Sequence, residues 1–117
     1  MATPLLDGSA AAFLDLLAAC PVVSGAIVSK PLLNRPEGRV VIFAMDAGQE
    51  MSEHRTPFLT TVHVLDGRVR FAVGADEREM TANHWLLMPY DAPHRLKAIE
   101  PSRFLLTFMK PAAAAQP

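Results

Sequence analysis

The sequence predicts an all-β domain, either a sandwich or a barrel. Between residues 22 and 109 about nine short apolar runs follow one another at a spacing of roughly ten residues. Turn-forming residues separate the runs, and the ten prolines of the chain fall mostly between them. Short strands joined by abrupt turns are typical of all-β folds. The length of 117 residues fits one domain.

Composition and charge exclude several classes of protein. Half of the residues are hydrophobic and 20% are charged, which is not the composition of a disordered chain. Eleven Lys and Arg against twelve Asp and Glu leave a net charge of −1, so no basic surface for nucleic acid is expected. The single cysteine, Cys20, cannot form an intrachain disulfide, which agrees with a cytoplasmic location. The longest uncharged stretch, Leu16–Ser29, is shorter than the ~20 residues of a membrane span.

The first twenty-one residues are expected to form a short helix and an arm. Asp7, Gly8 and Ser9 are residue types that cap helices, residues 10–19 favour a helix, and Pro21 ends it. An alternative interpretation is a lipoprotein signal, because residues 17–20 resemble its cleavage box. The absence of Lys or Arg before Lys30 favours the helix, since a signal peptide needs a positive start.

Residues 22–110 are expected to form the β domain and residues 111–117 a disordered tail. The expected strands are Val22–Leu33, Arg39–Asp46, Met51–Thr56, Phe58–Leu65, Arg68–Val73, Glu77–Thr81, Trp85–Met88, His94–Ile99 and Arg103–Met109.

Three of these segments carry more specific signals. Asp66-Gly67 is the clearest hairpin turn, because both residues tolerate a positive φ. Arg68–Val73 alternates polar and apolar residues, so one face of that strand is expected to meet water. Residues 40–45 are apolar on both faces, which suggests that a second subunit covers the outer face and that the protein is a homodimer.

Two of the four histidines stand in patterned surroundings. His54 follows Gly48, and Thr56, Thr60 and Gly67 come after it. The second pattern is formed by Asn83, Pro89, Asp91, His94 and Ala98. The other two, His63 and His84, are expected on the outer surface and at the rim without an assigned role.

These spacings resemble the two sequence motifs of the cupin family. The first motif reads Gly, five residues, His-x-His, three or four residues, Glu, six residues, Gly. The second reads Gly, five residues, Pro-x-Gly, two residues, His, three residues, Asn. The resemblance covers about residues 38–110. It implies a cupin-type β-barrel, which is a double-stranded jelly roll. The short N-terminal helix predicted above would precede this barrel.

The resemblance also implies a metal site. Metal-binding cupins hold Fe, Mn, Ni, Cu or Zn with three histidines and one glutamate. Here His54 and His94 occupy two ligand positions, while Thr56 and Thr60 occupy the other two and are poor ligands for a transition metal. A third ligand could be Glu50, which strand parity places on the His54 face, although a bulge would change this.

Strand parity also predicts the lining of an internal pocket. The inward residues beside the two histidines are Thr56, Phe58, Thr60, Val62 and Leu96. A mostly apolar pocket with a few polar groups is typical of small-molecule sites. Three interpretations stay open, namely a metal-bound pocket, a metal-free ligand pocket, and a barrel filled by its own side chains.

Three classes of function follow from these interpretations. The first is a small metal-dependent enzyme of the dioxygenase or isomerase type. The second is a non-catalytic ligand-binding or sensor module without metal, and the third is a structural or partner protein. Some cupins are the ligand-sensing halves of transcription factors, but no helix-turn-helix segment is expected before Val22 or after Met109, so direct DNA binding is not expected.

Overall fold

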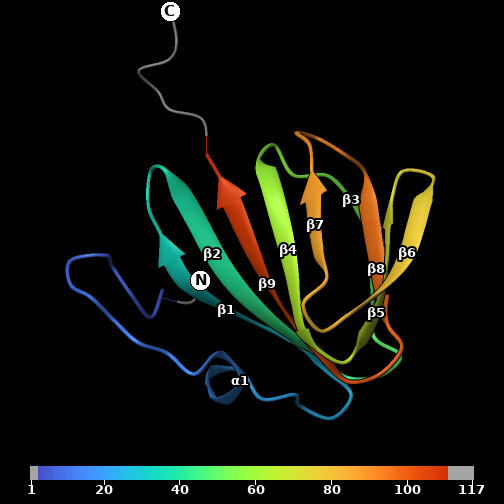
Figure 1. The fold of residues 1–117 in the computed structure, drawn as a ribbon, viewed down its shortest axis with the longest axis horizontal. Coiled ribbons are helices and arrows are strands. Elements are labelled where there is room, and N and C mark those ends of the chain that lie inside the picture. Colours follow the sequence, from blue (N-terminus) through green and yellow to red (C-terminus); the bar gives the residue numbers. More distant parts are fainter. Residues whose placement is uncertain (1–2, 111–117) are drawn as a thin grey trace, which may run out of the picture.

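The computed structural model describes residues 3–110, which form two antiparallel sheets packed face to face (Figure 1). The strands of this part of the chain are β1 (Ile27–Asn34), β2 (Gly38–Met45), β3 (Glu50–His54), β4 (Leu59–Asp66), β5 (Arg68–Val73), β6 (Asp76–Thr81), β7 (Trp85–Met88), β8 (His94–Ala98) and β9 (Ser102–Met109). The predicted all-β jelly roll is confirmed, and each predicted strand is present with shifts of a few residues at its ends.

The two sheets have the orders β1-β2-β9-β4-β7 and β3-β8-β5-β6. Strand β9 illustrates why these residues form strands, since its residues alternate between buried and half-buried along its length. Its inward side chains are Phe104, Leu106 and Phe108. They meet Phe71 and Leu96 of the opposite sheet in one hydrophobic core. The core therefore lies between the sheets, as alternating strands require.

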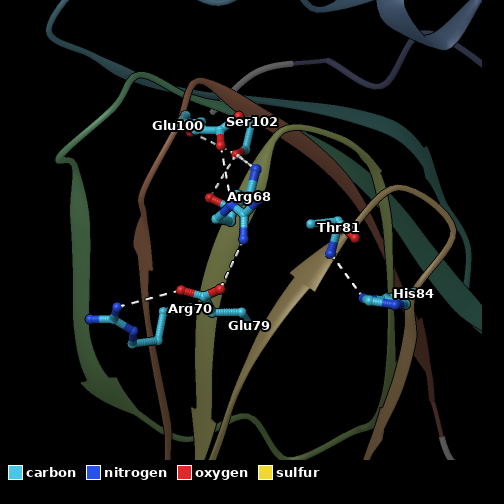
Figure 2. A network of polar contacts seen from close by, with 7 residues as sticks. All are labelled: Arg68, Arg70, Glu79, Thr81, His84, Glu100 and Ser102. Carbon is cyan, nitrogen blue, oxygen red and sulfur yellow. Dashed lines mark hydrogen bonds and ion pairs between the residues drawn. The ribbon is translucent and has the colours of Figure 1, made fainter.

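The Asp66-Gly67 turn does not form the predicted hairpin. Strand β4 pairs with β7 and β9, whereas β5 pairs with β6 and β8, so the turn joins the two sheets. Gly67 has a φ of +84° and bends the chain sharply there. The buried Ser102 hydroxyl holds this corner, because it accepts from the Arg68 N–H at 2.9 Å and donates to the Glu100 carbonyl at 2.7 Å (Figure 2).

The outer face of β2 is covered by the chain itself. Ile42 and Ala44 are fully buried and pack with Cys20 and Leu32 in a second cluster, against which Leu16 also packs. The prediction that a second subunit covers these residues is therefore wrong. The segment before β1 lies over this face and removes its apolar surface from water.

The N-terminal helix is shorter than predicted. Only α1 (Leu16–Ala19) is helical, and the Asp15 carboxylate caps it by accepting from the Ala18 N–H at 3.3 Å. Phe13, within the segment that was predicted to be helical, is 98% exposed. Helices below about 12 residues are marginal without packing. The upstream backbone pairs with β1 instead, since the N–H groups of residues 5 and 6 donate to the carbonyls of residues 31 and 32.

Two further expectations concern the ends and membranes. The predicted disordered tail, residues 111–117, lies outside the described residues. Within residues 3–110, no helix has the length and apolar character that crossing a membrane requires.

Candidate functional site

The structure brings His54 and His94 together. They are direct neighbours across the pair formed by edge strand β3 and strand β8. Their ring centroids are 4.1 Å apart with an interplanar angle of 61°, an edge-to-face contact. His94 is buried, whereas His54 is exposed. The pair therefore extends from the buried interior of the sandwich to its solvent-exposed surface.

Both histidines are held by backbone carbonyls. Nδ1 of His54 donates to the Ser52 carbonyl at 2.9 Å, and Nδ1 of His94 donates to the Ala92 carbonyl at 3.0 Å. A carbonyl oxygen only accepts, so the proton of each neutral ring is on Nδ1. Each ring consequently keeps the Nε2 lone pair for a ligand, a proton or a metal ion.

His94 is the more perturbed of the two rings. Its side chain is stacked on Phe71 with centroids 6.1 Å apart, and the residue is 4% exposed. Burial lowers the pKa of His94 below its ordinary value of 6.5, and the nearby His54 lowers this pKa further, while the bond to Ala92 acts in the opposite direction. His94 is therefore a neutral base at neutral pH.

This shift makes the stability of the fold depend on pH. The unfolded chain protonates His94 near its ordinary pKa of 6.5, whereas the folded chain resists protonation until a lower pH. The contribution of His94 to the free energy of unfolding should therefore be fully present above about pH 6.5 and should fall as the pH drops below 6.5. Melting temperatures at about pH 7.5 and about pH 5.5 should differ more in the wild type than in His94→Gln. An equal difference in both proteins would contradict the assignment, because the other histidines are common to both.

Two loops are tied together beside the histidine pair. The Arg55 guanidinium donates to the Asp91 carbonyl at 2.9 Å, and the Asp91 N–H donates to the Thr56 carbonyl at 2.8 Å. Asp91 has a φ of +56° and Asn83 a φ of +70°, and these are the positive-φ residues other than glycine in the part of the chain that the structure describes. Both stand where the second sequence motif has glycine. Asn and Asp are the residue types that best replace glycine in this conformation.

The predicted pocket residues are used mainly for packing. Thr60 is fully buried, and its hydroxyl donates to the Phe58 carbonyl at 3.0 Å and lies 3.4 Å from the Thr56 hydroxyl. Phe58 packs edge-on against Phe108. Val62 and Leu96 belong to the hydrophobic core, with exposures of 0% and 5%. The two threonines thus satisfy each other and nearby backbone beside the core.

Glu50 does not lie on the His54 face, and the parity prediction is wrong. Glu50 is opposite Lys97 and is exposed, while its neighbour Met51 is opposite the buried Leu96 and packs against the core. A register shift between Met51 and His54 then places His54 opposite His94. This irregularity reverses the parity, so that Glu50 and His54 face opposite ways.

The residues therefore fit a metal site only in part. No group of three or more His, Cys, Asp or Glu side chains able to hold a metal ion is found within residues 3–110. The histidine pair supplies two imidazole ligands, and no carboxylate in the part of the chain that the structure describes completes a two-histidine, one-carboxylate set. No reaction step can be assigned to a metal from these side chains.

Sequence reasoning missed a cavity of about 470 Å³ beside strands β5, β6 and β7. Its apolar walls are Phe71, Val73, Met80 and Leu86. None of the predicted site residues lines it, although Phe71 also contacts His94. The signal that could have found it is the register of β5 and β6. Phe71 is opposite Arg78 and Val73 is opposite Asp76, so charged residues of β6 share the face of apolar β5 residues.

Comparison with known sequences links the chain to one family. The model of the AraC-like ligand binding domain matches residues 38–116. No curated protein matches the chain.

Three solved structures show how widely the architecture is shared. A conserved protein of unknown function from Streptococcus pyogenes is 26% identical with a TM-score of 0.83, covering 95% of this chain and 97% of the other. A cupin 2 conserved barrel domain protein from Leptotrichia buccalis is 26% identical with a TM-score of 0.79, over 83% of this chain and 47% of the other. An RmlC-like cupin protein from Desulfovibrio desulfuricans is 23% identical with a TM-score of 0.77, over 88% and 100%.

Proposed function

This chain belongs to the family of AraC-like ligand binding domains, which are cupin-type domains, and we propose that it binds a small molecule with His54 and His94 as the polar end of the site. One observation carries the proposal. A buried, neutral His94 contacts His54 while the Nδ1 atoms of both rings are already bonded to backbone. Two Nε2 atoms are thereby left for a partner.

The chemistry of the pair indicates what the ligand offers. A neutral imidazole whose proton is on Nδ1 presents only an acceptor at Nε2. The site therefore favours a ligand that donates hydrogen bonds, such as one with hydroxyl or amide groups. Because burial lowers the pKa of His94, this acceptor persists at neutral pH and below.

The proposed site is tested with the variant His54→Ala/His94→Ala. Wild type and variant are screened by thermal shift against neutral polyhydroxylated and amide-bearing metabolites. A ligand at a hundredfold excess over its Kd stabilises the protein by about 2.7 kcal/mol. We expect at least one compound to raise the melting temperature of the wild type and not that of the double variant. A compound that stabilises both proteins equally would place its site elsewhere.

A second candidate function is binding of Fe, Mn, Ni, Cu or Zn through the same pair. The bonds from Nδ1 to backbone carbonyls favour it, since metal-bound histidines commonly donate their other N–H in this way. The remaining coordination positions would be left to water or substrate, because Thr56 and Thr60 are poor ligands. If the pair binds a metal, the protein would be a metal-dependent enzyme of the dioxygenase or isomerase type. If it binds a ligand without metal, the protein would be a sensor or binding module.

Metal content separates the two candidates. The untagged protein is purified without chelator, analysed for metals, and then titrated with each of the five ions. Stoichiometric uptake that disappears in His54→Ala/His94→Ala would support the metal. The absence of uptake would leave the metal-free ligand site. The double variant should stay folded, because the apolar faces of the strands carry the stability.

A further inference from the structure

A second concave region, lined by neither histidine of the pair, is the cavity of about 470 Å³ beside β5, β6 and β7. Its floor is apolar and built from rigid strands, with Phe71 and Met80 almost fully buried. At its edge Trp85 is 61% exposed, although tryptophan is usually well buried. A wide aromatic ring that stays in water beside an apolar floor is typical of a surface that receives a flat ligand.

The acidic side chains that line this cavity are already paired. Figure 2 shows the Glu79 carboxylate between Arg68 and Arg70, and its distances from these two guanidinium groups are 3.0 Å and 3.6 Å. The Asp76 carboxylate accepts from Arg78 at 3.0 and 3.5 Å. Both carboxylates thus already have arginine partners, with which a cation would have to compete.

The hydrogen-bond donors that line the cavity, in contrast, keep N–H groups without an assigned acceptor. Nδ1 of His84 accepts from the Thr81 N–H at 2.9 Å (Figure 2), so the neutral ring carries its proton on Nε2. Arg78 uses its Nε and one terminal nitrogen on Asp76, and its guanidinium has further N–H groups. Trp85 adds an indole N–H. The lining thus offers donors from three side chains, while its carboxylates already have partners.

We propose that this cavity is a second binding site, which takes a small aromatic carboxylate. The aromatic ring lies on the apolar floor against Trp85, and the carboxylate accepts hydrogen bonds from Arg78 and His84. Arg78 is the principal anchor through the N–H groups that Asp76 does not use, because hydrogen bonds from a guanidinium to a carboxylate are charge-assisted. The site uses neither His54 nor His94, so its ligand contacts are separate from those of the function proposed above, although Phe71 of its floor is stacked on His94.

Trp85 is the only tryptophan of the chain, so its fluorescence reports directly on this site. The probe is 4-nitrobenzoate, which quenches tryptophan, and the comparison compound is the uncharged 4-nitrobenzamide of nearly the same shape. We expect saturable quenching by 4-nitrobenzoate and an at least tenfold weaker affinity for the amide. Equal affinities, or quenching that rises linearly without saturation for both compounds, would overturn the proposal.

The matched variants are Arg78→Gln and Arg95→Gln. Both arginines are exposed and contact an acid of β6, but neither Arg95 nor its partner Glu77 lines this cavity. Arg78→Gln should weaken 4-nitrobenzoate binding at least tenfold, whereas Arg95→Gln should leave it within twofold of the wild type. The same affinity in both variants would overturn the assignment of Arg78.

A third variant separates this site from the histidine pair. His54→Ala/His94→Ala should bind 4-nitrobenzoate with unchanged affinity, because neither histidine lines the cavity. Loss of binding in that variant, with retention in Arg78→Gln, would mean that the probe occupies the proposed function's site and would refute the second one.

Discussion

Gly67→Ala is expected to destabilise the protein by about 2–5 kcal/mol. Gly67 has a φ of +84°, where a residue with a Cβ loses roughly 1–2 kcal/mol. The added methyl group would also overlap the Pro101 carbonyl and the Ser102 hydroxyl, and would lie 2.6 Å from the Ser102 Cα. Forcing atoms into a packed site costs about 1–3 kcal/mol more. The corner between the sheets depends on these same atoms, so the chain cannot easily move away.

The free energy of unfolding in urea measures this effect, and Gly48→Ala is its control. Gly48 has nearly the same φ, +85°, but an added Cβ would meet no heavy atom within 4 Å. Gly48→Ala should therefore show only the backbone cost of about 1–2 kcal/mol. If the two variants lose the same free energy of unfolding, steric crowding by the added methyl group does not contribute to the loss at Gly67.

Phe104→Ala is expected to cost about 3–5 kcal/mol of unfolding free energy. Phe104 is 1% exposed and lies on the central strand β9, where it is stacked on Phe43 with centroids 5.3 Å apart. Removing its ring would leave a cavity at the centre of the core, because the neighbouring strands are fixed by their hydrogen bonds and relax only partly. A domain of this size is stabilised by only about 6–18 kcal/mol in total.

The matched control is the same substitution at Phe13, which is 98% exposed. Phe13→Ala should change the unfolding free energy by less than about 0.5 kcal/mol. Urea unfolding of both variants gives the comparison. A loss in Phe104→Ala as small as that in Phe13→Ala would show that β9 is not central to the core.

Local sequence patterns predicted the strands because a half-buried strand requires alternation. Arg68–Val73 shows this at its centre, since Val69 and Phe71 are buried and Arg70 is exposed, although Ala72 on the same face as Arg70 is also buried. The resemblance to the two cupin motifs implied that His54 and His94 share a site, and they are neighbours in adjacent strands. Even without glycine at Asn83 and Asp91, the positive φ that those motif positions require is kept.

Strand parity failed where the backbone is irregular. The register shift between Met51 and His54 places Glu50 and His54 on opposite faces of the strand, and no residue type in that segment indicates such a shift. The turn at Asp66-Gly67 was predicted correctly, but the prediction that it forms a hairpin was wrong. Whether a sharp bend returns a strand to its neighbour or passes it to the opposite sheet depends on Ser102, which is distant in sequence.

The sequence by itself determined the class of fold, the positions of the strands and the pair of histidines, because alternation, turn residues and motif spacing are local properties of the chain. Only the tertiary structure decided which residues share a site. It buried the outer face of β2 under the chain's own N-terminal segment, turned Glu50 away from the histidines, and set Trp85 beside Arg78. These outcomes depend on register, bulges and long-range packing, which arise only when distant segments meet.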